Sequence, residues 1–163
     1  MADEINRQRV LKFFDAYYRG DTEAAAKCCA ADVLLMVYLP VELFPHLGPQ
    51  RGRKAVTDLM AVLDARYSRQ RHEVKFLVAD KQRAAAIIDV TYTKRGDARV
   101  IQLPSGNFFE FERGLITEIR CFFDTIDWVA QLAGRDLAGS VLREVGNALS
   151  PPPLDPAWAT WPG

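Results

Sequence analysis

Three aspartates interrupt apolar segments of the sequence, where a carboxylate is costly unless it is paired or takes part in chemistry. Asp124 and Asp127 lie in IRCFFDTIDW, residues 119–128, and Asp89 lies in RAAAIIDVTYT, residues 83–93. Burial in an apolar pocket raises the pKa of a carboxyl group, so that the group can act as a general base near neutral pH. This pattern identifies Asp124 and Asp89 as candidate catalytic bases.

Each aspartate also has a structural interpretation. Asp124 is placed to cap the helix that follows, and Asp127 then lies in the first turn, where the helix dipole stabilises negative charge. We assign Asp127 to this structural role, whereas Asp124 can hold both roles because a cap fixes only its rotamer. Asp89 is either paired with Arg99 or Arg120, or it faces a pocket as an acid or base.

The elements that position these residues begin with helices around one strand. Apolar residues at helical spacing predict a helix over 4–19, which Gly20 ends, and a short helix over 22–30. The apolar run at 32–40 is typical of a buried strand. After a loop rich in proline and glycine, a third helix is expected over 52–70.

The second half of the chain changes to the period of strands. Short turns between four such segments favour an antiparallel meander, which after the helices makes an α+β fold. One or two further helices are expected over 125–149, before a tail in which prolines exclude a regular helix. The four predicted strands are residues 72–80, 83–94, 98–112 and 115–124.

Composition excludes several classes of function. The 163 residues fit one domain, and 21 basic residues balance 21 acidic ones, so we expect neither nucleic-acid binding nor attachment to a membrane. An odd number of cysteines and an N-terminus without a signal-peptide pattern favour the cytoplasm. The chain has no HExxH, CxxC or nucleotide-binding glycine pattern, so no metal and no cofactor are expected.

The order of elements and four short motifs resemble the nuclear transport factor 2-like superfamily over residues 4–135. Within it the chain is most similar to the SnoaL-like branch of polyketide cyclases, which has relatives among ketosteroid isomerases and limonene-epoxide hydrolases. The motifs are YYRGD at 17–21, GRKAV at 52–56, FERGLITEIRCFFD at 111–124 and DTIDWVAQL at 124–132.

This resemblance implies a curved antiparallel sheet that forms an open cone, with N-terminal helices on its concave face and a pocket between them. It also implies a homodimer formed through the outer face of the sheet. Residues 1–135 are then the cone domain, and 136–163 are a helical extension and tail that carries Trp158 and Trp161. We expect these tryptophans to pack on the domain itself or on a partner.

Most of the catalytic residues of these families have no counterpart at the matching positions of this chain. The three ketosteroid isomerase positions fall on Phe13, Val37 and Asn107, so that activity is not expected. The acid on the final strand of epoxide hydrolases falls on Cys121, and only Asp89 of their Arg-x-Asp pair remains. The aspartate at the end of the last strand in SnoaL-like cyclases corresponds to Asp124.

The leading expectation is a cofactor-free acid/base enzyme, of isomerase, cyclase or hydrolase type, acting on a hydrophobic carbonyl or cyclic molecule. The alternatives are a noncatalytic module that binds an apolar ligand, and an interaction protein that works through its sheet face or its tail. The residues assigned are Asp124 and Asp89 as catalytic, and Tyr38, Asn107, Phe13, Tyr17, Cys121 and Phe123 as substrate-binding.

Overall fold

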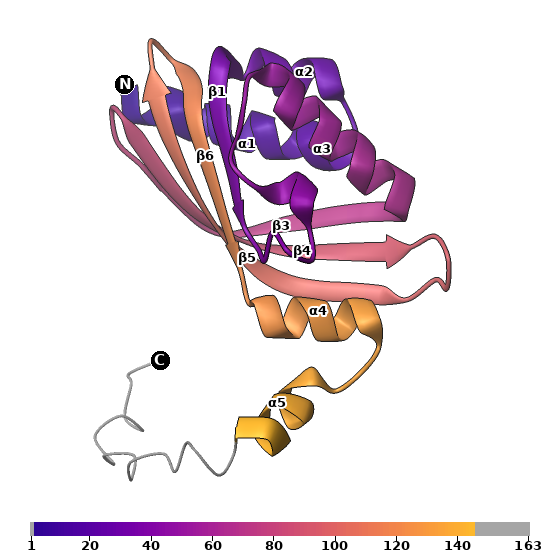
Figure 1. Ribbon diagram of the computed structural model, residues 1–163. Coiled ribbons are helices and arrows are strands. Elements are labelled where there is room, and N and C mark those ends of the chain that lie inside the picture. The colour runs from indigo at the N-terminus through magenta and orange to yellow at the C-terminus, as the bar shows by residue number, and fades with distance from the viewer. Residues whose placement is uncertain (1, 146–163) are drawn as a thin grey trace, which may run out of the picture.

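Six strands form one curved sheet in the computed structural model, which describes residues 2–145 (Figure 1). The strand order is β2-β1-β6-β5-β4-β3; β1 and β6 are parallel and the other neighbours are antiparallel. The strands are β1 (Cys29–Tyr38), β2 (Gln50–Arg51), β3 (Tyr67–Ala79), β4 (Arg83–Lys94), β5 (Val100–Glu112) and β6 (Leu115–Phe123).

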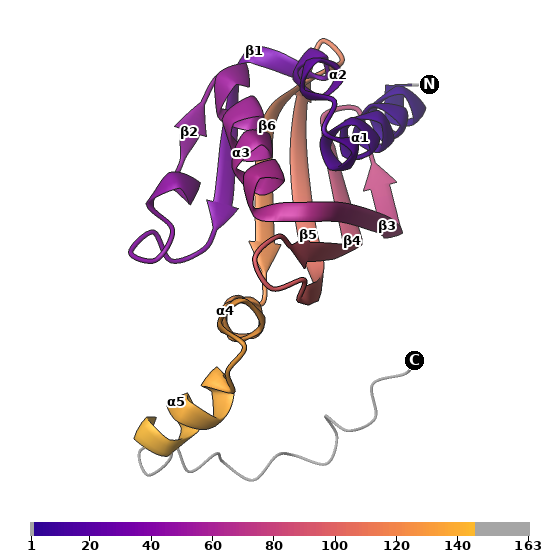
Figure 2. The ribbon, with the colours of Figure 1, turned by 90° about the vertical axis from the view of Figure 1, so that its right-hand side faces the viewer.

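The helices lie mainly on the concave face of this sheet, so the predicted α+β architecture is confirmed (Figure 2). Helices α1, α2 and α3 cover that face, whereas α4 and α5 follow β6 beyond the end of the sheet. No described helix is both long and apolar enough to cross a membrane. The helices are α1 (Ala2–Arg19), α2 (Thr22–Lys27), the 3-10 turn η1 (Pro45–Leu47), α3 (Arg53–Arg66), α4 (Thr125–Ala133) and α5 (Leu137–Val145).

The structure differs from the prediction in the ends of two helices and in one additional strand, and strand pairing explains all three differences. The helix predicted over 52–70 ends at Arg66, because Tyr67 already pairs with Lys94 in the β3–β4 ladder. The helix predicted over 22–30 ends at Lys27, and Cys29 belongs to β1. Strand β2 lies in the segment predicted to be a loop and pairs with β1. In all three cases pairing with a distant strand outweighs the local pattern.

Alternation along the central strands directs one set of side chains into the core. Every second residue of β5 is buried, including Leu103 and Phe109. The Phe109 ring lies 6.0 Å from Phe13 and 5.5 Å from Phe14, both on α1. Alternation in β4 and β6 likewise buries Ile88, Val90 and Ile119 on this same face.

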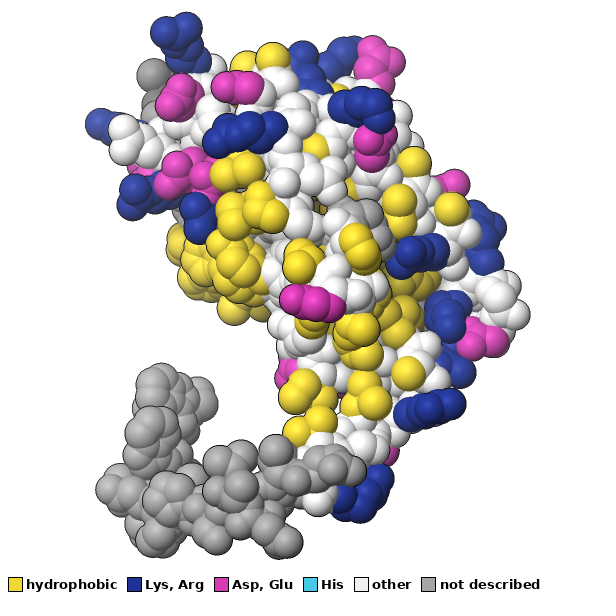
Figure 3. All heavy atoms as spheres, viewed as in Figure 1, with side chains coloured by type: hydrophobic (Ala, Val, Ile, Leu, Met, Phe, Trp, Pro, Cys, Tyr) yellow, Lys and Arg dark blue, Asp and Glu magenta, His cyan; other side chains and the backbone are white. Residues whose placement is uncertain are grey.

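The opposite face of the sheet carries an exposed apolar row that crosses five strands in register. Figure 3 shows hydrophobic side chains gathered there, on the side away from α1–α3. The ring of Tyr38 stacks on that of Phe122 with centroids 4.2 Å apart, and Phe122 also meets Phe108 edge-on. We call this set the outer row, and its successive partners are Tyr38, Phe122, Gly106, Ile87 and Phe76.

Candidate functional site

An apolar cavity lies between the helices and the concave face of the sheet. Its walls come from α1, β1, η1, α3, β4, β5, β6 and α4, and its volume is about 50 Å³. The structure brings five of the residues predicted to bind substrate together around it. These five are Phe13, Tyr17, Asn107, Cys121 and Phe123.

Tyr38, the sixth predicted binding residue, is not part of this cavity. Val37 lines the cavity, so alternation along β1 turns Tyr38 to the outer face, where its side chain is exposed. The hydroxyl of Tyr38 accepts a hydrogen bond from Nη1 of Arg120 at 3.0 Å. Arg120 itself is paired with Glu118. Tyr38 therefore belongs to the outer row rather than to the site.

Asp89 also lies on the outer face of the sheet. Its neighbours in β4, Ile88 and Val90, are fully buried on the inner side, and alternation places Asp89 on the other. Oδ2 of Asp89 is 3.5 Å from Nζ of Lys75, so its partner is a lysine of β3 and not one of the two arginines predicted. The position of Asp89 does not support a role as a base inside the cavity.

Asp124 is the N-cap of α4, as predicted. Its Oδ1 accepts the backbone N–H of Asp127 at 2.9 Å, and the Asp124 side chain is exposed. Asp127 lies in the first turn and accepts a hydrogen bond from Nε2 of Gln131 at 2.9 Å. Strand β6 ends at Phe123, and the chain then turns into the helix. The cavity is therefore lined by Phe123 but not by the carboxylate that follows it.

The cavity is electrically neutral at pH 7. Among the described residues that line it, none carries a side chain that is normally charged at that pH. Burial raises the pKa of Tyr17 and Tyr18 well above the usual phenol value, with smaller contributions from neighbouring phenols and Cys121. Burial also raises the pKa of Cys121 to about 12, so this residue is a thiol and not a nucleophilic thiolate.

Asn107 offers a fixed hydrogen-bond acceptor in this neutral cavity. The side chain is 4% exposed, and its Nδ2 donates to the backbone oxygen of Ser105 at 3.1 Å and to Oγ of Ser105 at 3.0 Å. A carbonyl oxygen can only accept, which identifies the Asn107 atom facing it as the nitrogen. Oδ1 of Asn107 has no hydrogen bond to the described part of the chain.

Trp128, on α4, is a lining residue that the sequence did not single out. The residue is 7% exposed, and its indole Nε1 is buried with no hydrogen-bond partner among the described residues. Its ring stacks on Phe44 and contacts Phe123. Burial raises the pKa of the nearby Tyr67 hydroxyl, and Arg66 and Trp128 partly offset this rise. The indole N–H of Trp128 lies near the Tyr67 phenol but does not form a hydrogen bond with good geometry to it.

Two signals in the sequence could have identified Trp128. Tryptophan buries more area than other side chains, and its N–H usually finds a partner when it is buried. Trp128 follows the capping residue Asp124 by one helical turn, which places it back over the end of the strand. The sequence did not reveal which face of this helix would turn toward the pocket.

Comparisons with known proteins agree with this fold. A family model described as a SnoaL-like domain matches residues 10–119. A search of curated proteins finds no match. A candidate isomerase from Rhodopseudomonas palustris has a solved structure with a TM-score of 0.70 and 26% identity, covering 78% of this chain and 97% of that one.

Two further solved structures show the same fold at lower identity. An LEH-like epoxide hydrolase from M. tuberculosis has a TM-score of 0.67 at 18% identity, covering 90% of this chain and 99% of that one. A candidate polyketide cyclase from Xanthomonas campestris has a TM-score of 0.63 at 22% identity, covering 81% and 99%. These relatives are named for different reactions, so the fold by itself does not select one of them.

Proposed function

Because the chain belongs to the SnoaL-like domain family, we propose that its cavity binds a small, neutral and mostly apolar molecule that carries an accepting oxygen. The observation that carries this proposal is the buried indole N–H of Trp128, which has no hydrogen-bond partner among the described residues and belongs to a side chain that lines an apolar cavity. Buried polar groups without partners are rare in folded proteins, and a bound ligand is one of the groups that can pair with them.

The energetics favour a ketone, ester, ether or alcohol. A buried donor without a partner costs roughly 1–3 kcal/mol, and a ligand oxygen that accepts from Trp128 would remove this cost. Oδ1 of Asn107 could in addition accept from a ligand hydroxyl. A carboxylate or an ammonium group is disfavoured, since the described cavity wall has no opposite charge to compensate for its desolvation.

A matched pair of probes, acetophenone and ethylbenzene, tests this proposal. We expect replacement of Trp128 with phenylalanine to weaken acetophenone binding about 5–10-fold, equivalent to the loss of one hydrogen bond. Ethylbenzene has nearly the same shape but no oxygen, so its affinity should change less than about twofold by the same argument. Both affinities can be measured by NMR titration of the ¹⁵N-labelled protein.

The NMR spectrum also reports the hydrogen bond directly. Single Trp158→Phe and Trp161→Phe variants identify the indole signal of Trp128, which should move downfield with acetophenone and not with ethylbenzene. Equal losses of affinity for both probes in Trp128→Phe would mean that Trp128 acts through its ring alone, and the proposal would then fail.

Catalysis by a carboxylate is the second candidate, because the family's relatives include proteins named as enzymes. Asp124 directly follows a residue that lines the cavity and would have to turn inward to reach a ligand. Asparagine can also cap a helix, so Asp124→Asn removes the base while keeping the cap. With cyclic ketones and epoxides as substrates, turnover that is lost in Asp124→Asn but kept in Asp127→Asn would support this candidate.

We also propose that the outer row pairs with the same row of a second copy of this chain. Its members Phe76, Ile87 and Phe122 are 49%, 48% and 39% exposed, a contiguous apolar surface of the kind that marks an interface. At about 4.8 Å between strands the row is roughly 19 Å long, a suitable core for a standard interface of about 800 Å² per partner.

Charges around the outer row favour a second copy over a partner of strong charge. Each basic side chain beside the row is balanced by an acidic one, so two identical faces would meet without net repulsion. A two-fold axis makes such an interface self-complementary. The ion pairs are those of Lys75 with both Glu73 and Asp89, of Arg83 with Glu110, and of Arg120 with Glu118.

A further inference from the structure

The cavity is too small, as it stands, for a molecule that contains a ring. Its volume is about 50 Å³, whereas an apolar cavity that takes up benzene has a volume of about 150 Å³. Binding of a cyclic ligand, which the proposed function implies, therefore requires one wall to move. The wall element that moves with the smallest loss of free energy is the one with the fewest buried contacts.

Among the α-helices of the wall, α4 is the least anchored in the core. Helix α3 buries four side chains in the core, among them Val56 and Met60, and α1 buries Val10 and Phe14. In α4 only Trp128 is buried. Segments with few buried apolar contacts open locally without global unfolding. Outward displacement of α4 would move the Trp128 side chain with it and enlarge the cavity, while the indole still forms part of the wall.

The side chain of Gln131 joins α4 to β5 at a point where β5 has no hydrogen-bonded neighbour on the β6 side. Pairing of β5 with β6 ends at Ser105 and Phe123, so Gln102 lies beyond the reach of β6. The amide of Gln131 takes its place: Oε1 accepts from the Gln102 N–H at 2.9 Å, and Nε2 donates to the Gln102 oxygen at 2.9 Å.

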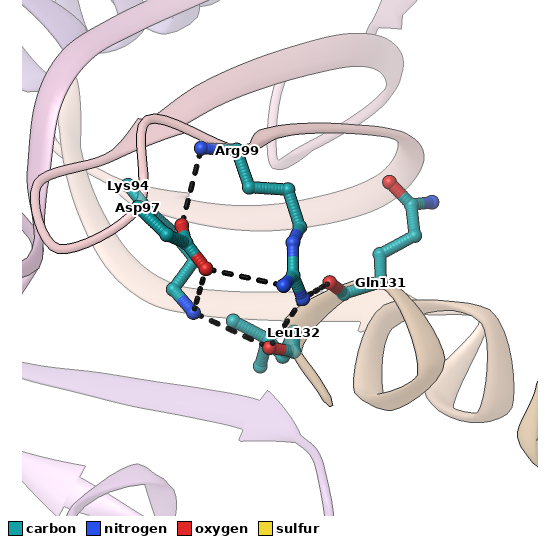
Figure 4. Close-up of polar contacts among 5 residues, drawn as sticks. All are labelled: Lys94, Asp97, Arg99, Gln131 and Leu132. Carbon is teal, nitrogen blue, oxygen red and sulfur yellow. Dashed lines mark hydrogen bonds and ion pairs between the residues drawn. The ribbon is translucent and has the colours of Figure 1, made fainter. Parts of the chain in front are cut away.

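The hairpin between β4 and β5 holds the same C-terminal end of α4 (Figure 4). Nη1 of Arg99 donates to the backbone oxygens of Gln131 at 3.2 Å and Leu132 at 3.3 Å, and Nζ of Lys94 donates to the Leu132 oxygen at 3.4 Å. Asp97 pairs with Arg99 at 3.1 Å and so holds the guanidinium in place. Cations at the end of a helix satisfy its last carbonyls and its dipole.

We propose that α4 is a movable wall of the cavity and that these contacts form the latch that keeps it closed. The latch consists of Lys94, Asp97, Arg99 and Gln131, and the first three come from the hairpin rather than from the cavity. The Gln131 hydrogen bonds are exposed and those of Arg99 and Lys94 are part-buried. Such contacts near the surface are individually weak, so the latch can open while the core stays folded. Arg99 is then a positioning residue that controls access to the cavity through Trp128.

The test uses Arg99→Met, which keeps the length of the side chain and removes its donors. In a Trp158→Phe, Trp161→Phe background Trp128 is the sole tryptophan, and acrylamide quenching of its fluorescence reports how often α4 opens. We expect the quenching rate constant to rise roughly fivefold in Arg99→Met, as for the loss of one hydrogen bond. The urea midpoint of unfolding should change little.

Arg95→Met is the matched control. Arg95 lies in the same hairpin, but its Nε donates to the backbone oxygen of Asp64 at 2.8 Å and does not touch α4. Gln131→Met removes a different part of the latch and should act like Arg99→Met. Quenching that is unchanged in both latch variants, or raised equally by Arg95→Met, would overturn the proposal.

The quenching experiment needs no ligand, so it separates this proposal from the proposed function on which it rests. If the latch variants expose Trp128 and acetophenone also enters and leaves them faster than wild type, both proposals are supported. If they expose Trp128 but acetophenone does not bind the wild-type cavity, the movable wall is supported and the proposed function is overturned.

Discussion

Replacement of Phe122 with glutamate is expected to convert a dimeric protein into a monomer and to raise the dimer dissociation constant at least about 100-fold. Phe122 lies within the outer row, stacked on Tyr38 and packed edge-on against Phe108. At a two-fold interface the change buries a carboxylate in each copy without an opposite charge to pair with it. Sedimentation equilibrium over a range of protein concentrations measures the effect.

Ile5→Glu is the control for this substitution. Ile5 is 52% exposed on α1 and lies outside the outer row, so a glutamate there should leave the association unchanged. If the wild-type protein is a monomer at about 100 µM, the interface is too weak to matter at ordinary concentrations and the dimer proposal fails. It fails equally if Phe122→Glu sediments as the wild type does.

Asn107→Asp is expected to destabilise the protein by about 3 kcal/mol at pH 7.5, because it leaves a buried charge without compensation. The new carboxylate would face the backbone oxygen of Ser105, which now accepts from Nδ2 of Asn107. Burial and this repulsion raise the pKa of the introduced carboxyl in the folded state above its value in the unfolded chain.

The sign of the pH dependence follows from that raised pKa. An acid that is harder to ionise in the folded state destabilises the fold increasingly as the pH rises above its unfolded-state pKa, and the loss is complete above the raised folded-state pKa. As the pH falls toward 4.5, the folded state regains the proton and the variant approaches wild type in stability. Urea denaturation at pH 7.5 and 4.5 measures both values.

Asn107→Leu provides the comparison, since it has a similar volume and cannot ionise. Its stability relative to wild type should not depend on pH. If the loss in Asn107→Asp is the same at both pH values, Asn107 is not in the desolvated surroundings that its burial indicates.

Which residues of a strand share a face could be predicted because alternation is a local property of strands. The resemblance indicated that Asn107 and Cys121 lie on the inward face. Phe109 and Cys121 are buried or face the cavity as their neighbours in sequence require, and Asn107 shares the face of Phe109. The resemblance supplied the remaining step, which was to place Phe13 and Tyr17 of the first helix opposite that face.

The roles of the two candidate bases depended on features that alternation does not determine. Strand β6 ends at Phe123, so Asp124 caps a helix outside the cavity. The ladder between β3 and β4 changes register between Val74 and Phe76, and Lys75 lies at this irregularity within reach of Asp89. Because a bulge re-aims side chains, the pairing of Asp89 with Lys75 could not be predicted from the spacing.

The position of Trp128 on the cavity wall could not be predicted, because it depends on contacts between distant parts of the chain. The sequence predicted terminal helices over 125–149 but not the side of α4 that would contact the sheet. That side is set by Gln131 against β5 and by Arg99 of the hairpin. The tail that carries Trp158 and Trp161 lies outside the described residues, so the prediction that it packs on a surface stays a prediction.

A crystal structure of the protein with 4-bromoacetophenone would show whether the cavity binds a ketone through Trp128, because anomalous scattering from bromine locates the ligand. We expect one ligand between α1 and the concave face of the sheet, with its carbonyl oxygen accepting from the Trp128 indole and with α4 displaced outward. Bromine only on the outer row, or a ligand in the cavity whose oxygen points away from Trp128, would contradict this expectation.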